Sequence, residues 1–171
     1  MELKELTDKT LNLFKVKNTK ELLAAIEKSY NNNDIMQQFC DLVNNDLSVD
    51  WLQKIYQYYE ADRKDKKQDY TPASLADLMA DIALSQSNEV IDMCAGSGAL
   101  TIAAWRKNPK VKATCIEFDQ NVIPILVFNL AIRNISANVI RTDVLTREQF
   151  EEYRITRGEK FGKVEEYDNS N

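Results

Sequence analysis

The sequence predicts an α/β fold, in which a short parallel sheet of three or four strands with helices packed on it follows a helical N-terminal region. Two observations predict this fold. Between residues 90 and 142, apolar runs of strand length alternate with helical stretches, an order that is typical of parallel sheets. Residues 1–60, in contrast, space their apolar side chains as helices do.

Helix signals recur through the N-terminal region. Asn18 and Glu21 have the spacing of a capping pair at the start of one helix. Asp34 is expected to cap the next helix, which the Asn-Asn-Asp run at 44–46 ends. A further helix is expected to begin near 48–50, with an aromatic stripe on one face that indicates a core or partner surface.

A mixed-charge connector at 61–70 divides the chain into a helical region, 1–60, and a second domain, 71–171. Thr71 and Pro72 are expected to open the second domain as the cap and first residue of a helix. The predicted buried face of this helix consists of Leu75, Leu78, Met79 and Ile82.

Strands and helices alternate after that helix. The sequence predicts strands at 90–93, 111–118 and 138–142, with helices at 99–107 and 120–134 between them. From Asp143 onward the chain is polar, with one short strand expected at 163–165.

Composition excludes several kinds of chemistry. The 171 residues include no histidine, which excludes Ser-His-Asp triads, histidine bases and histidine zinc sites. Cys40, Cys94 and Cys115 lie far apart in apolar stretches, so we expect buried reduced thiols and no metal site. The net charge of −5 argues against a broad basic face for nucleic acid. No apolar run approaches the length of a membrane span, which favours a cytoplasmic protein without a membrane partner.

A glycine turn is the strongest signal for a ligand site. Asp92-x-x-x-Gly96-x-Gly98 directly follows an apolar strand and precedes a helix, and it holds two of only four glycines in the chain. Glycines at such a turn let the backbone approach a ligand closely and present amide groups at the start of the helix. We therefore expect a bound ligand at this turn.

Acidic residues follow each predicted strand. Glu117 ends the second strand, 19 residues beyond Gly98, where a carboxylate accepts hydrogen bonds from the ribose of an adenosine-type ligand. Asp143 follows the third strand, so that Asp92, Glu117 and Asp143 are expected to line the carboxyl edge of the sheet. A nicotinamide dinucleotide is the alternative ligand. Thr101 replaces the third glycine of that motif, and an acid precedes the glycine pair, which favours S-adenosylmethionine.

Two motifs in order also resemble a known family. Residues 68–72, Gln-Asp-Tyr-Thr-Pro, followed by the glycine turn, resemble the paired cofactor motifs of adenine-specific (N6) DNA methylases, especially the modification (M) subunits of type I restriction-modification systems. The resemblance covers roughly 50–145 and implies a Rossmann-like class I methyltransferase core that binds S-adenosylmethionine.

The resemblance also implies roles in binding the cofactor. In that family the Tyr-Thr-Pro segment covers the methionine end, the turn lies under the cofactor, the second acid holds the ribose and the third faces adenine. These roles fall on Tyr70, Thr71 and Pro72, on Asp92, Ala95, Gly96 and Gly98, on Glu117, and on Asp143, with Phe118 beside the adenine ring.

The sequence departs from the family at the catalytic motif. Asn-Pro-Pro-Tyr, or a close relative, follows a fourth strand in the family and stacks on a flipped base. Here 161–164 is the nearest candidate for that strand, but 165–169 contain no proline, and all three prolines lie elsewhere. The sequence therefore assigns no catalytic residue.

Three hypotheses remain open. In the first, the chain is an S-adenosylmethionine-dependent DNA adenine methyltransferase, either a fragment or a minimal phage- or plasmid-type relative, which needs another chain for catalysis and to hold DNA. In the second, it is a catalytically inactive binding or regulatory module that acts through protein contacts. A small-molecule or RNA methyltransferase is the third. Because so short a sheet leaves an apolar edge, we expect self-association or a partner subunit there.

Overall fold

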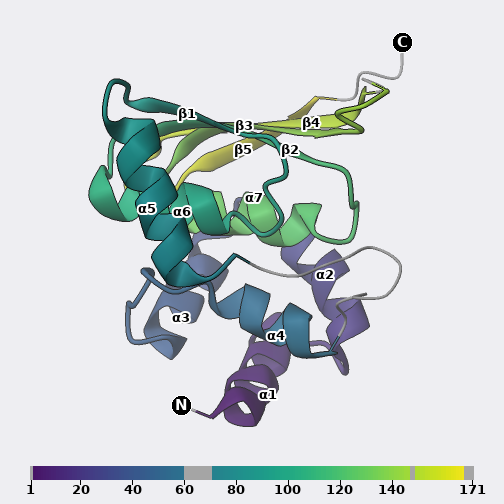
Figure 1. Cartoon of the computed structure of the whole chain (residues 1–171). Coiled ribbons are helices and arrows are strands. Elements are labelled where there is room, and N and C mark those ends of the chain that lie inside the picture. Colours follow the sequence, from purple (N-terminus) through teal and green to yellow (C-terminus); the bar gives the residue numbers. More distant parts are fainter. Residues whose placement is uncertain (1, 60–70, 147–148, 168–171) are drawn as a thin grey trace.

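The computed structural model describes residues 2–59, 71–146 and 149–167 (Figure 1). The connector at 61–70 and Tyr70 lie outside the described residues. In chain order the elements are α1 (Leu3–Phe14), α2 (Thr19–Glu27), α3 (Asn33–Leu42), α4 (Trp51–Tyr59), α5 (Ala73–Leu84), β1 (Glu89–Asp92), α6 (Ala99–Lys107), β2 (Lys112–Glu117), α7 (Ile123–Ile132), β3 (Ser136–Thr142), β4 (Gln149–Thr156) and β5 (Lys163–Tyr167).

The strands form one mixed sheet in the order β1-β2-β3-β4-β5. β1, β2 and β3 run parallel, whereas β4 and β5 are antiparallel to their neighbours. The predicted α/β class with N-terminal helices is confirmed, but the sheet has five strands among the described residues, and the sequence prediction missed β4. Tyr153 and Ile155 of β4 are buried and alternate with Glu152 and Arg154, a short strand pattern that the sequence prediction overlooked in an otherwise polar segment.

The helices gather on one side of the sheet (Figure 1). The other face carries a groove of 370 Å³ that crosses four strands at Ile91, Thr114, Asn138 and Arg154. Parallel strands are normally covered on both faces. The described part of the chain thus leaves one face of its parallel strands open.

Side-chain caps start the N-terminal helices. The Asn18 side chain accepts the Glu21 amide at 3.0 Å, and the Glu21 carboxylate accepts the Lys17 amide in return, which confirms the capping pair. The cap of α3 is Asn32, not Asp34 as the sequence indicated, because Asn32 accepts the Ile35 amide. Asp50 caps α4 by accepting the amide of Gln53 at 2.9 Å, and the helix begins at Trp51, next to the predicted start near 48–50.

One core joins the N-terminal helices to the sheet region. Every residue of α7 is buried, and its Phe128 ring packs edge-on against Phe14 of α1 and Phe39 of α3, with ring centroids 5.8 and 5.6 Å apart. Tyr30, which follows α2, makes the same type of contact with Tyr153 of β4. The N-terminal helices therefore pack directly on α7 and β4.

The predicted buried face of α5 is wrong. Leu75, Leu78, Met79 and Ile82 are 47–63% exposed, and the buried positions are Ala76 and Ala80. Small side chains let α5 approach α6 closely, and because the helix is apolar almost all round, its spacing alone did not identify the inner face. The helix begins at Ala73 with Pro72 as its N-cap, one residue later than expected.

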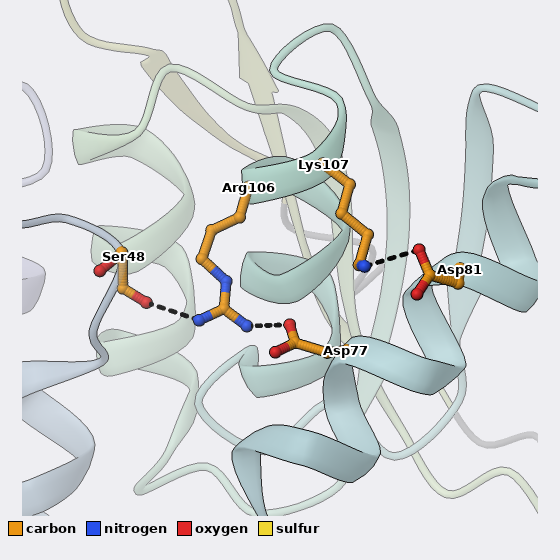
Figure 2. A network of polar contacts seen from close by, with 5 residues as sticks. All are labelled: Ser48, Asp77, Asp81, Arg106 and Lys107. Carbon is orange, nitrogen blue, oxygen red and sulfur yellow. Dashed lines mark hydrogen bonds and ion pairs between the residues drawn. The ribbon is translucent and has the colours of Figure 1, made fainter.

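Ion pairs fix α5 against α6 (Figure 2). Arg106 pairs with Asp77, and Lys107 Nζ lies 2.6 Å from a carboxylate oxygen of Asp81. Arg106 also donates to the Ser48 carbonyl oxygen at 3.5 Å and so connects α6 to the segment before α4. Such exposed pairs contribute little individually, so they orient α5 more than they stabilise it.

Candidate functional site

The turn between β1 and α6 depends on its two glycines. Gly96 has φ +54° and Gly98 has φ +99°, in the left-handed region that side chains disfavour. A Cβ atom at Gly96 would meet nothing within 4 Å, whereas one at Gly98 would lie 3.1 Å from Leu126 Cδ1. The Ala95 amide donates to the Ile116 carbonyl oxygen at 2.9 Å, which holds the turn against β2. Gly96 thus faces open space and Gly98 faces the core.

The Glu117 carboxylate fixes the same turn from the neighbouring strand. Its Oε2 accepts the Gly96 amide at 2.7 Å, and its Oε1 accepts the amides of Phe118 and Asp119, both at 2.8 Å. These bonds use three of about four lone-pair positions of a carboxylate. One position on Oε2 is left for a ligand hydroxyl, and the carboxylate is already oriented.

Asp92 lies beneath the turn with only 7% of its surface exposed. Its Oδ2 accepts the Thr101 hydroxyl at 3.3 Å, and that hydroxyl also lies 3.4 Å from Cys115 Sγ. Burial raises the pKa of Asp92, and the charge of Glu117 adds to this, while Thr101 and the Cys94 amide oppose it. Burial also raises the pKa of Cys115 to about 12, so its thiol stays protonated.

Two further residues predicted to bind the cofactor, Phe118 and Asp143, follow the ends of β2 and β3. β2 and β3 pair Glu117 with Arg141, so Asp143 follows the end of the adjacent strand, where its Oδ1 accepts the Leu145 amide. Phe118 directly follows Glu117 and is 61% exposed. The structure thus brings Asp92, Glu117 and Asp143 to one edge of the sheet, as the sequence predicted.

Thr71 and Pro72 lie at the start of α5, where the Pro72 carbonyl oxygen accepts the amides of Leu75 and Ala76. Among the described residues, no hydrogen bond joins either of them to the glycine turn. Their predicted role over the cofactor therefore stays a prediction.

Sequence reasoning missed a buried contact below the turn. The Ser97 carbonyl oxygen accepts a hydrogen bond from the Asn129 side chain at 2.9 Å. Asn129 is the single amide side chain in the otherwise apolar helix α7, a position that signals a specific buried partner. Thr101 was noted only because it is not a glycine, although its hydroxyl binds Asp92.

Other candidate chemistries find little support in the described ranges. They contain no group of three or more His, Cys, Asp or Glu side chains suited to a metal ion. Cys40 and Cys115 are buried free thiols as predicted, but Cys94 is exposed because it sits in the turn instead of within β1. None of the helices among these residues is long and apolar enough to cross a membrane.

Comparison with known families now agrees with this geometry. The model of the N-6 DNA methylase family matches residues 44–164, which is more than half of the chain and includes α4, the glycine turn and all five strands up to Val164. The chain belongs to the N-6 DNA methylase family. No curated protein and no solved structure matched it.

For this N-6 DNA methylase chain, the match confirms the resemblance that the sequence motifs indicated. The match begins within the segment before α4, so the unit that the family shares includes the cap residue Asp50 as well as the sheet. The narrower resemblance to modification subunits of type I systems stays a prediction.

Proposed function

We propose that this chain binds S-adenosylmethionine at the glycine turn and forms the cofactor-binding part of a DNA adenine-N6 methyltransferase. The proposal rests on the backbone conformation and the surroundings of Gly96. Its amide is fixed by Glu117, its backbone is left-handed, and a side chain there would project into open space at the carboxyl edge of the sheet. Ligands of open α/β sheets bind at that edge.

The residues present fit this cofactor. Glu117 has a lone-pair position for a ribose hydroxyl, and the exposed Phe118 ring offers a flat apolar surface to adenine. Asp143 follows the next strand and supplies an acceptor for the adenine amine. When bound, S-adenosylmethionine supplies a methyl group activated by its sulfonium sulfur. The chain's own contribution is to bind and orient that group.

The geometry favours this cofactor over a nicotinamide dinucleotide. In the dinucleotide motif the third glycine permits close packing of the helix on the strand. Here that position is Thr101, which is buried and hydrogen-bonded to the equally buried Asp92. A carboxylate beneath the turn leaves less room for a pyrophosphate and repels its negative charge.

The place of a catalytic face is a separate question from the place of the cofactor site. β4 pairs with β3, and β5 lies at the opposite end of the sheet from β1, so the segment 161–164 is far in strand order from the glycine turn. β1 has β2 as its single strand partner among the described residues. Ile91 within β1 and Met93 just after it are 72% and 57% exposed. We propose that a partner subunit or a second copy pairs with β1 and completes the catalytic face, and that DNA binding needs this help.

Calorimetric titration tests cofactor binding. We expect saturable binding of S-adenosylmethionine and of its demethylated product, and no heat of binding with NAD⁺ at the same concentrations. The matched variant Glu117→Gln should bind both methionine compounds more weakly, and Glu159→Gln, at an exposed position in the β4–β5 turn, should bind them as the wild type does. Equal affinity for NAD⁺, or none for S-adenosylmethionine, would contradict the proposal.

Methyl transfer separates the enzyme from a second candidate, a catalytically inactive module that acts through protein contacts. The absence of an Asn-Pro-Pro-Tyr motif in the sequence favours this candidate. With labelled S-adenosylmethionine and DNA, the enzyme proposal expects label in adenine N6 when the products of neighbouring genes are added. That outcome would also support a restriction-modification or phage context. Cofactor binding without transfer under any of these conditions favours the inactive module.

A further inference from the structure

A series of buried hydrogen bonds connects the glycine turn to the segment before α4. The Asn129 Nδ2 group donates to the Ser97 carbonyl oxygen and to Asp50 Oδ1, each at 2.9 Å. Ser97, Asn129 and Asp50 are 1%, 2% and 8% exposed. Both amide hydrogens of Asn129 are therefore used, one on the turn and one on the cap residue of α4.

Arg133, one helical turn after Asn129, extends this series of hydrogen bonds. Its Nη1 group donates to Asn129 Oδ1 at 3.1 Å and to the Asn129 carbonyl oxygen at 2.8 Å. Its Nε and Nη2 groups donate to the carbonyl oxygens of Leu47 and Val49 at 2.8 and 2.9 Å. Arg133 is 5% exposed, so these contacts replace water for most of its donors.

Two arginines hold three consecutive carbonyl groups of this segment. Arg133 of the α7 end takes Leu47 and Val49, and Arg106 of α6 takes Ser48 between them. α6 directly follows the glycine turn. α7 follows β2, the strand whose Glu117 contacts the turn. The segment 47–50 is thus tied to both sides of the candidate site.

The buried charges of Asp50 and Arg133 are opposite in sign, but removing each of them from water costs free energy. Burial raises the pKa of Asp50 and lowers that of Arg133 to about 10, and each charge partly offsets the shift of the other. Well-packed apolar residues often stabilise a fold as much as a buried charged pair does, so stability alone is a weak account of such a network. An apolar α7 would leave the Ser97 carbonyl oxygen without its donor.

The turn is therefore held from two directions. Glu117 fixes the Gly96 amide from the ligand side, and Asn129 fixes the Ser97 carbonyl oxygen from the core side, between two left-handed glycines. We propose that Asn129 is a positioning residue, which holds the turn in its cofactor-binding shape. Asp50 and Arg133 hold the Asn129 side chain in place, so that cofactor affinity is coupled to the packing of 47–50. The coupling to affinity rests on the proposed function, whereas the effect on the shape of the turn does not.

An exchange of amide and carboxylate tests the proposal. Asp50 Oδ1 accepts both Asn129 Nδ2 and the Gln53 amide, so an amide group that donates from this position also uncaps α4, which the melting temperatures record. In the double variant Asp50→Asn with Asn129→Asp, the carboxylate introduced on α7 still accepts from Arg133 and from that amide group. Its oxygen, however, faces the Ser97 carbonyl oxygen without a hydrogen. Asp50→Asn alone keeps the Asn129 donor on Ser97 and serves as the conservative variant. Asn134→Asp is the matched control, because Asn134 follows α7 and binds the Gly158 backbone, not the turn.

Two readouts separate positioning from stability. Without ligand, the amides of Gly96 and Gly98 should exchange hydrogen at least about tenfold faster in the double variant than in the wild type, and not in Asp50→Asn or Asn134→Asp. In calorimetry, S-adenosylmethionine should bind the double variant about 10- to 100-fold more weakly, and the other two within about threefold of the wild type. Melting temperatures are recorded in parallel for all variants.

The outcomes are distinct. If the wild type binds no S-adenosylmethionine, the proposed function fails, and the exchange of Gly96 and Gly98 still decides whether the network holds the turn. If the double variant melts lower but keeps wild-type exchange and affinity, or if Asn134→Asp weakens affinity equally, the network is structural only and the inference is overturned. If the double variant does not fold, the wild type decides, because bound cofactor should slow amide exchange at Ser48 and Val49, and an unchanged rate contradicts coupling.

Discussion

Gly96 and Gly98 share a left-handed backbone but have different surroundings, and this predicts different effects of alanine. Gly98→Ala places Cβ 3.1 Å from Leu126 Cδ1 in addition to its unfavourable φ, so we expect it to lower the free energy of unfolding by about 1–3 kcal/mol. Gly96→Ala carries only the backbone cost of about 1 kcal/mol, but its methyl group enters the ligand space. Urea denaturation and calorimetric titration of S-adenosylmethionine measure the two effects.

For Gly96→Ala we expect the loss of cofactor affinity to exceed what its small loss of stability explains. A variant with wild-type affinity would show that the ligand does not approach this residue. Gly98→Ala, assayed at a temperature where it is fully folded, is the control for backbone strain in the same turn.

Asp92 predicts an unusual pH dependence of stability. Because burial raises its pKa above the ordinary 3.8, the folded chain binds a proton at higher pH than the unfolded chain does. The charged form therefore destabilises the fold at neutral pH, and the penalty falls as the pH drops through the raised pKa toward 3.8. Asp92→Asn keeps an acceptor for Thr101 and removes the titration. We expect this variant to be at least as stable as the wild type at pH 7, with the difference shrinking toward acid.

Denaturation curves between pH 7 and about pH 4.5 test this, with Asp8→Asn at an exposed position of α1 as the control. A constant loss of stability in Asp92→Asn at every pH would mean that the charged carboxylate is needed by the fold itself.

At the residue scale, the sequence predicted where the acids and glycines lie, because strand ends and turns mark them locally. Glu117 and Gly96 are 21 residues apart, yet both were identified from their own neighbours. The Ser97–Asn129–Asp50 contacts join residues 32 and 79 positions apart, and no local pattern gives the partner of a buried amide. The lone Asn129 in α7 signalled that a partner exists, without saying which.

At the scale of elements, α5 leads to a test of which face is inner. Leu78→Gln and Ile82→Gln change exposed side chains, so each should alter the free energy of unfolding by less than about 0.5 kcal/mol. Ala80→Leu adds volume at a buried position and should destabilise by about 1–3 kcal/mol. Thermal unfolding of the three variants measures both effects. The reverse order would place Leu78 and Ile82 in the core, as the sequence had indicated.

Elements with strong local signals were predicted well. The bounds of α6 match the expected 99–107, and β3 begins within two residues of its prediction. β4 was missed because its outward residues Glu152 and Arg154 make the segment polar, and burial of Tyr153 and Ile155 depends on the helices beneath them. The antiparallel direction of β4 and β5 follows from how the chain returns, which strand patterns do not record.

For the whole molecule, the exposed β1 edge and the outer face of α5 predict association. Met79 and Ile91 line one hollow between α5 and β1, so the apolar surface is continuous from the helix to the strand. We expect sedimentation velocity at rising concentration to show species above the 19.7 kDa of one chain, and Ile91→Lys to suppress them. Thr114→Lys, on the next strand of the open face, is the matched control. A chain that stays monomeric at all concentrations would contradict self-association through this edge.

The two edge strands of the sheet, β1 and β5, differ in whether their outer backbone groups are already bound. At β5, the Asn31 side chain donates to the Val164 carbonyl oxygen and accepts its amide, each at 2.9 Å, which occupies the outer backbone much as a neighbouring strand would. Among the described residues, no side chain distant in sequence binds the β1 backbone in this way; the Glu89 amide donates only to the nearby Ser87 hydroxyl. We therefore expect an added strand to pair beside Asp92, not at the far end. If an added strand pairs with β1, the docking that buries Ile91 would place side chains of the added chain next to the proposed cofactor site, so we expect any methyl transfer to depend on assembly.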